Sequence, residues 1–209
     1  MSGISTRFRG FLPVVIDVET GGFNPVTDAL LEVAAVFIEL TDSGTLVPGE
    51  KHRFMVKPFE GANLEAASLQ VTGIDPFNPL RPAIEEGDAL RRLFTEIRRE
   101  VKQRECKRAV LVGHNAFFDL QFVNAVVDRC AIKRNPFHPF SSFDTATLAG
   151  VAFGQTVLSR AVEAAGGSWE EERAHSALYD AEQTAFVFCE IVNRFRGIYE
   201  EALASSTVP

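Results

Sequence analysis

The sequence predicts a single α/β domain, residues 1–209, built on a mixed five-stranded sheet flanked by helices. The order of the segments predicts this fold: β-rich segments come first, helical and β-rich segments then alternate, and helices come last. The composition agrees, because 46% of the residues are hydrophobic and 23% are charged, as in ordinary folded domains. A chain of 209 residues is also long enough to bury a substantial core.

Three β-rich segments open the chain. Val14–Val18 ends at a Thr-Gly-Gly turn, Leu30–Leu40 is apolar and β-branched, and His52–Lys57 follows the turn at residues 42–44. We expect these segments to form an antiparallel meander, since consecutive strands joined by turns pair in this way.

Helices and strands alternate in the second half. Apolar residues between positions 90 and 101 repeat at helical spacing and leave the arginines on the other face. The expected elements that follow are strand Ala109–Val112, helix Leu120–Val127, a Pro-rich loop Asn135–Pro139, a short strand Ser141–Thr145 passing into a helix, and helices near Thr156–Ala165 and Ser176–Phe195. The expected core spans about residues 7–195, and Ser205–Pro209 is expected to be a short flexible tail.

Charge and cysteine content limit the function classes. With 21 basic and 28 acidic residues the net charge is −7, which excludes coating of nucleic acid by bulk charge. Eight basic and three acidic residues nevertheless lie between Arg91 and Arg108, either as a solvated helix face or as a local polyanion site. No apolar stretch approaches the roughly 18 residues of a membrane span. Three cysteines without CxxC spacing indicate no disulfide framework, so we expect a cytoplasmic protein.

Two carboxylates follow each other on the first strand. Asp17 and Glu19 flank Val18, and strand alternation points both side chains to the same face. Like charges this close are costly near a buried strand unless a cation lies between them, and carboxylate oxygens suit Mg²⁺ or Mn²⁺. The alternative is a strand end that emerges into solvent.

Further acidic residues follow later elements. Asp119 lies just beyond the fourth strand, where α/β proteins place ligands, or it is an acid at a helix N-terminus. His175 and Asp180 share a loop–helix junction, unless Ser176 caps the helix and Asp180 faces solvent. Asp144 is expected to be either a helix cap or an acid that supports the metal ligands from behind, and not a ligand itself.

Three motifs occur in order: D-x-E at Asp17, H-N-x-x-F-D ending at Asp119, and H-x-A-x-x-D from His175 to Asp180. This combination resembles the DEDDh 3′→5′ exonuclease family, which has a ribonuclease H-like fold. The segments Arg7–Phe11, Lys133–Phe140 and Gly154–Ser159 resemble the ribonuclease T branch of that family.

The resemblance implies phosphodiester hydrolysis with two Mg²⁺ ions, or Mn²⁺ as a substitute. Asp17, Glu19 and Asp180 would hold one ion, Asp17 and Asp119 would help to hold the second, and His175 would take the proton of the attacking water. The implied activity trims the 3′ ends of tRNA and other stable RNA precursors, releases nucleoside 5′-monophosphates, and extends to single-stranded DNA.

Substrate contacts are implied by the same resemblance. Phe23, Phe118 and Phe140 would rim one cleft and stack on the terminal bases, unless they are core residues. A homodimer is implied, in which the basic surface of one subunit holds the RNA cut by the other. The residues implied for that surface are Arg7, Arg9, Lys102, Arg104, Lys107, Arg108, Lys133 and Arg134.

One departure concerns the segment between Leu64 and Gly73. Ala67 and Val71 stand where the family has an acidic residue and a further stacking phenylalanine, so we expect weaker discrimination against a terminal C. The alternatives to the exoribonuclease are a DNA proofreading exonuclease of the same family, a non-catalytic nucleic-acid-binding module, and a metal-dependent phosphatase for small substrates. Because all four acidic positions and His175 are present, the sequence argues against the non-catalytic module.

Overall fold

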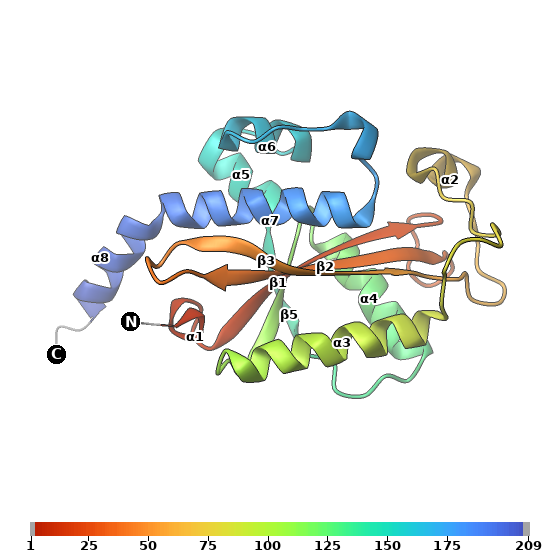
Figure 1. The fold of residues 1–209 in the computed structure, drawn as a ribbon, viewed down its shortest axis with the longest axis horizontal. Coiled ribbons are helices and arrows are strands. Elements are labelled where there is room, and N and C mark those ends of the chain that lie inside the picture. The colour runs from red at the N-terminus through yellow and green to blue at the C-terminus, as the bar shows by residue number, and fades with distance from the viewer. Residues whose placement is uncertain (1–2, 207–209) are drawn as a thin grey trace.

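A five-stranded sheet organises residues 3–206, which are the residues that this computed structural model describes (Figure 1). The strands are β1 (Phe11–Thr20), β2 (Leu30–Leu40), β3 (Leu46–Met55), β4 (Arg108–Gly113) and β5 (Phe137–Asp144). Their order across the sheet is β3-β2-β1-β4-β5. β2 is antiparallel to both β1 and β3, whereas β4 is parallel to both β1 and β5. The predicted mixed sheet is therefore confirmed.

Helices cover both faces of the sheet. α7 crosses one face with α5 and α6 outside it, and α3 and α4 lie on the other (Figure 1). The α-helices are α1 (Ile4–Arg7), α2 (Ala66–Thr72), α3 (Glu86–Gln103), α4 (Phe117–Arg129), α5 (Thr145–Phe153), α6 (Leu158–Ala165), α7 (Ala177–Arg194) and α8 (Arg196–Ser206). Among residues 3–206, no helix combines the length and the hydrophobicity that a membrane-spanning segment requires.

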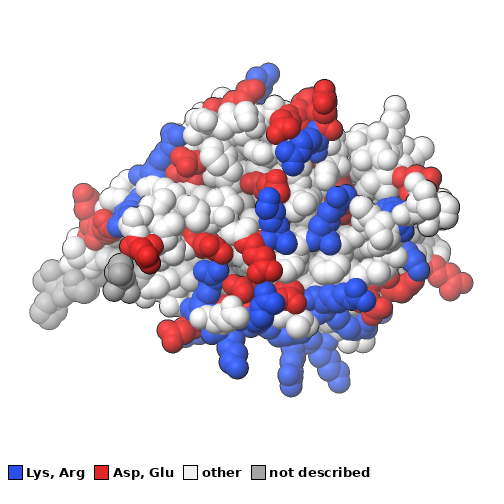
Figure 2. Space-filling model, in the orientation of Figure 1, with Lys and Arg blue, Asp and Glu red and all other residues white. Residues whose placement is uncertain are grey.

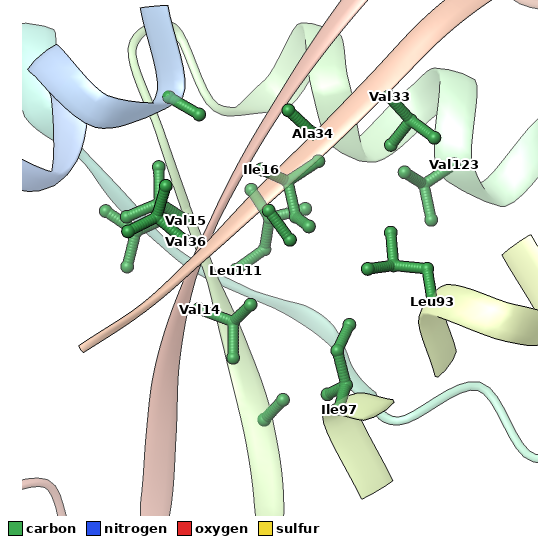
Figure 3. Packing of buried hydrophobic residues seen from close by; sticks show 14 of the residues in the cluster. Val14, Val15, Ile16, Val33, Ala34, Val36, Leu93, Ile97, Leu111 and Val123 are labelled. Atoms are coloured by element: carbon green, nitrogen blue, oxygen red, sulfur yellow. The ribbon is translucent and has the colours of Figure 1, made fainter. Parts of the chain in front are cut away.

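The main core extends over both faces of the sheet, and one part of it fills the space between the sheet and α3. Val14 and Ile16 of β1 lie with Leu93 and Ile97 of α3 and with Val123 of α4, and all five are fully buried (Figure 3). Full burial of one such side chain stabilises the fold by roughly 1.5–3 kcal/mol. Because side chains alternate along a strand, the residues between and beyond this pair face α7 instead. Asp17 and Glu19 are therefore turned toward α7.

The two edge strands differ most from the prediction. β3 begins at Leu46 instead of His52, and β5 begins at Phe137, inside the segment 135–139 that was expected to be a loop. The loop prediction was wrong for residues 137–139. A loop was expected because Pro139 lacks an N–H donor and so disfavours a strand. An edge strand tolerates proline, since one side of it has no partner strand.

Three helices were not predicted: α1, α2 and α8. α8 continues the chain beyond α7, and its Tyr199 ring lies 3.5 Å from the guanidinium carbon of Arg7. Tyr199 also donates a hydrogen bond to the carbonyl of Thr6. Of the expected tail, Ser205 and Ser206 belong to α8, and residues 207–209 lie outside the described residues.

Candidate active site

Three carboxylates meet where β1 passes under the start of α7. Asp17 and Glu19 come from the carboxyl-terminal half of β1, and Asp180 comes from the first turn of α7. One oxygen atom from each carboxylate lies within 4.8 Å of the others. Residues 163 positions apart in the sequence are thus close enough to share one ion.

Asp119 approaches the same strand from α4. Its Oδ1 accepts a hydrogen bond from the backbone N–H of Val18 at 3.1 Å, and only 4% of the residue is exposed. This contact places Asp119 against β1 between Asp17 and Glu19. It is outside the cluster of three whose oxygens lie within 4.8 Å. The structure therefore brings all four predicted acidic residues to one end of β1.

Asp144 supports the loop that carries Asp119. It is the N-cap of α5 and accepts hydrogen bonds from the backbone N–H groups of Ala146 and Thr147. It also accepts one from the N–H of Asn115 at 2.8 Å, where the backbone is left-handed with φ of 64°. The prediction that Asp144 caps a helix is confirmed.

The carboxylates of the site strongly disfavour their charged forms. Burial, followed by the charge of Asp180, raises the pKa of Glu19 to about 8. Burial raises the pKa of Asp180 to about 6, and it raises the pKa values of Asp17 and Asp119 well above their ordinary range. The repulsion from Asp119 is the second cause of the shift at Asp17. Several carboxylates packed this closely need a cation to be charged at neutral pH.

The donor set fits a divalent cation that prefers oxygen ligands. All the candidate ligand atoms are carboxylate oxygens, which suit Mg²⁺ or Mn²⁺ better than Zn²⁺. Oδ1 of Asp180 is buried and has no hydrogen-bond partner among the described residues. A buried carboxylate oxygen without a partner is costly, and a cation would satisfy it.

His175 lies on the exposed loop that leads into α7. Its backbone is left-handed, with φ of 61°, and its N–H donates to Oδ2 of Asp180 at 3.3 Å. Ser176 occupies the N-cap position of α7, but its side chain makes no capping hydrogen bond. Asp180 faces the cluster, so the alternative of a Ser176 cap with a solvent-facing Asp180 is wrong. The backbone of His175 is thus held beside Asp180, at the edge of the carboxylate cluster.

An apolar pocket of about 230 Å³ adjoins Glu19. Phe23, which is 77% exposed, and Phe118 form its aromatic side, with ring centroids 6.2 Å apart. Phe118 also packs on Phe122 of the core, at 5.0 Å between centroids. The other lining residues are Val18, Thr20, Ala67, Ser68, Val71 and Thr72. Two of the three predicted phenylalanines, Phe23 and Phe118, therefore lie together in one pocket, and α2 forms its opposite wall.

Phe140 does not lie in this pocket. It is on β5, is 81% exposed, and packs edge-on against His138, which in turn contacts Phe11 at the start of β1. The expectation that one cleft holds all three phenylalanines is not met within one chain. The reason is that residues 137–144 form a strand parallel to β4, which brings only its end, Asp144, to the active site.

The predicted basic residues gather at the far end of the parallel strands. Lys102, Lys107, Arg108 and Arg134 line a groove of about 540 Å³, and Lys133 and Arg9 are exposed. Basic side chains are concentrated along the lower edge of the molecule, where α3 lies (Figures 1 and 2).

Two of the predicted basic residues are already engaged within the protein. Arg104 pairs with Glu100 at 3.1 Å and Glu39 at 3.3 Å. Arg7 stacks on Tyr199.

Sequence reasoning missed two residues at the site. Glu32 is buried on β2 beside Glu19, and a carboxylate inside the apolar run Leu30–Leu40 was the available signal. His114 forms hydrogen bonds with the Thr145 hydroxyl at 3.0 Å and with the carbonyl of Thr156 at 2.9 Å, which tie the loop after β4 to α5 and to the segment between α5 and α6. Its place in the H-N-x-x-F-D motif was the only sequence signal.

The family model described as Exonuclease matches residues 14–188 of this chain. The chain belongs to the ribonuclease T family of exonucleases. It is 60% identical over 193 residues to ribonuclease T of Marinobacter nauticus, covering 92% of this chain and 87% of that protein. It is also 60% identical to ribonuclease T of Hahella chejuensis, covering 93% and 89% of the two chains. The resemblance predicted from the motifs is confirmed, and the chain is a hydrolytic 3′→5′ exonuclease.

Solved structures support the fold. An E. coli ExoI–ssDNA complex with bound zinc has a TM-score of 0.67 and 18% identity, covering 93% of this chain. This chain spans 43% of that longer chain. The nuclease domain of 3′hExo, a DEDDh family member bound to rAMP, has a TM-score of 0.64 and 16% identity, with coverage of 89% and 92%. The expected ribonuclease H-like fold is confirmed.

Proposed function

We propose that this chain is a Mg²⁺-dependent 3′→5′ exoribonuclease that trims the 3′ ends of tRNA and other stable RNA precursors in the cytoplasm. The observation that carries the proposal is the carboxylate cluster of Asp17, Glu19 and Asp180 next to an aromatic pocket. A cluster of this kind suits hydrolysis, and stacking rings suit unpaired terminal bases. Single-stranded DNA is a second substrate, because base stacking does not depend on the sugar.

The chain's own residues divide the work of hydrolysis. Two bound divalent ions would lower the pKa of a water and stabilise the attacking and leaving oxygens. Asp17, Glu19 and Asp180 would hold one ion, and Asp17 with Asp119 would help to hold the other. His175 accepts the proton of the attacking water. A bond forms between that water's oxygen and phosphorus, and the bond from phosphorus to the 3′ oxygen breaks. The 3′ oxygen takes up a proton to become the new 3′ hydroxyl of the shortened chain, and a nucleoside 5′-monophosphate leaves.

The pocket at Phe23 receives the terminal base. Apart from Glu19, its polar lining residues are Thr20, Ser68 and Thr72. On α2, Ala67 and Val71 line the pocket at the positions where the family has an acidic residue and a stacking phenylalanine. Such a lining supports stacking and offers few hydrogen bonds to distinguish one base from another. We expect RNA oligomers ending in A and in C to be shortened at comparable rates, and a strong pause at C would contradict this.

The basic groove acts on a second copy of the chain. It lies at the amino end of β1, and Phe11 and Glu19 are eight positions apart along this extended strand, which corresponds to about 26 Å. A groove this far from its own cluster cannot position the same terminal nucleotide, but it can hold RNA for a partner subunit. Phe140 lies at the same end as the groove. A stable monomer with full activity on a tRNA-sized substrate would overturn the homodimer.

The test of the reaction uses single-stranded RNA labelled at the 3′ or the 5′ end, with Mg²⁺ or EDTA. The wild type should shorten the RNA stepwise from the 3′ end in Mg²⁺ only, and Asp17→Ala should not. Internal cuts, or shortening in EDTA, would overturn the proposal. Binding without shortening would support the non-catalytic module. The same DNA sequence, run in parallel, measures the preference between RNA and DNA.

A further inference from the structure

Glu32 is a buried carboxylate that the reaction scheme does not use. Only 2% of the residue is exposed, and it lies directly across from Glu19 in the antiparallel register of β1 and β2. Residues opposite each other on paired strands have Cβ atoms about 4.5–5.5 Å apart and point to the same face. Glu32 therefore faces the α7 side of the sheet, as Asp17 and Glu19 do.

The two oxygens of Glu32 have different surroundings. Oε2 accepts a hydrogen bond from the Arg53 guanidinium at 2.7 Å, while Oε1 is buried without a hydrogen-bond partner among the described residues. Arg53 is on the edge strand β3, opposite Ala34 of β2, and points to the same face of the sheet as Glu32. It therefore holds the Glu32 carboxylate from the side of the sheet edge. Oε1 of Glu32 is thus an unpaired oxygen on a carboxylate that lies next to Glu19.

Among the described residues, two other buried oxygens without partners lie on α7, the helix that packs on β1 and β2. Five side-chain atoms in residues 3–206 are buried without a hydrogen bond, and they include Oε1 of Glu32, Oδ1 of Asp180 and Oγ1 of Thr184. Asp180 and Thr184 are four residues apart on α7, so they share the helix face that packs on the sheet. Buried polar atoms without partners are rare in folded proteins and indicate a ligand or bound water.

We propose that Glu32 is a positioning residue of the metal centre, held by Arg53 so that its free oxygen and negative charge strengthen the binding of divalent ions by Asp17 and Glu19. This inference rests on the proposed metal-dependent function. A buried structural ion pair that uses both oxygens of its carboxylate occurs elsewhere in the chain. Glu86 provides that comparison, because it is 5% exposed and both its oxygens bind Arg129, at 2.7 and 2.8 Å.

The experiment is a calorimetric titration of Mn²⁺ into the wild type, Glu32→Gln and the matched control Glu86→Gln. Loss of a group that supports metal ligands typically weakens metal binding about 10–100-fold. We expect the Kd for Mn²⁺ to rise by that factor in E32Q and to stay within about twofold in E86Q. The difference in Tm between Mn²⁺ and EDTA should shrink only in E32Q, whereas a merely structural role would lower both Tm values together.

Each outcome decides between two statements. An E32Q protein that folds in EDTA and binds Mn²⁺ like the wild type would overturn the role of Glu32. A wild type that binds no Mn²⁺ would instead overturn the proposed metal centre. If E32Q does not fold, Glu32→Asp is titrated in its place, since it keeps the charge but withdraws it by one methylene. A rise in Kd supports the proposal, and an unchanged Kd overturns it.

Discussion

Glu19 makes the ion-free domain sensitive to pH. Burial and the charge of Asp180 raise its pKa from 4.5 to about 8 in the folded chain. Between these values the folded protein keeps a proton that the unfolded chain has released, so stability falls as the pH rises. Because proton binding is coupled to folding, this shift lowers the free energy of unfolding by about 5 kcal/mol over the whole range between the two pKa values. Of this, about 3.5 kcal/mol is lost between pH 5 and pH 8.

Glu19→Gln removes this dependence of stability on pH, because glutamine carries no charge at any pH. Thermal unfolding is followed in EDTA at pH 5 and pH 8. For a domain of this size, 1 kcal/mol shifts Tm by roughly 2–4 °C, so the wild type should lose about 7–14 °C more than E19Q between the two pH values. Glu86→Gln, which removes a buried carboxylate from outside the site, should behave like the wild type.

Saturating Mn²⁺ should remove most of the pH dependence in the wild type, because an ion favours the ionised carboxylates. Parallel losses in the wild type and E19Q in EDTA would refute the reasoning. That result would mean that the charge of Glu19 is already compensated without an ion.

Three further predictions concern the reaction and the pocket. His175→Ala should lower kcat about 10²–10⁴-fold and leave KM nearly unchanged in steady-state assays; a large change in KM alone would contradict a role in proton transfer. Phe23→Ala should weaken binding of single-stranded RNA by about 1–3 kcal/mol in fluorescence titrations, whereas Phe77→Ala, at a residue of equal exposure (76% against 77%), should not. Gly22→Ala should cost about 1–3 kcal/mol in thermal unfolding, because its Cβ would overlap the buried carboxylate of Asp28; wild-type stability would show that the loop adapts.

Residues with a strong local signature were predictable from the sequence. The β-rich run Val14–Val18 and the turn after it located β1, and the spacing of Asp17 and Glu19 placed both on one face, as the structure has them. α3 was also predictable, because its apolar stripe is regular. The motifs placed Asp119 and Asp180, since their positions relative to strand and helix ends are encoded locally.

Features that depend on tertiary pairing were not predictable. Nothing in the sequence near Phe140 shows that Pro139 lies in an edge strand, so its position far from Phe23 emerges only from the pairing of β5 with β4. The pairing of Glu32 with Arg53 depends likewise on the register between β2 and β3. Short helices such as α2 have too little periodicity to be recognised before they pack.

The distance in sequence between Asp17 and Asp180 has a consequence during protein synthesis. Proteins are synthesised from the N-terminus, so β1, which carries Asp17 and Glu19, leaves the ribosome long before α7 does. A growing chain that stops before residue 175 lacks both His175 and Asp180, so it is missing one of the proposed metal ligands and the proposed proton acceptor. We therefore expect nuclease activity to begin only when the chain is almost finished, so that a partly synthesised chain does not degrade the RNAs around the ribosome.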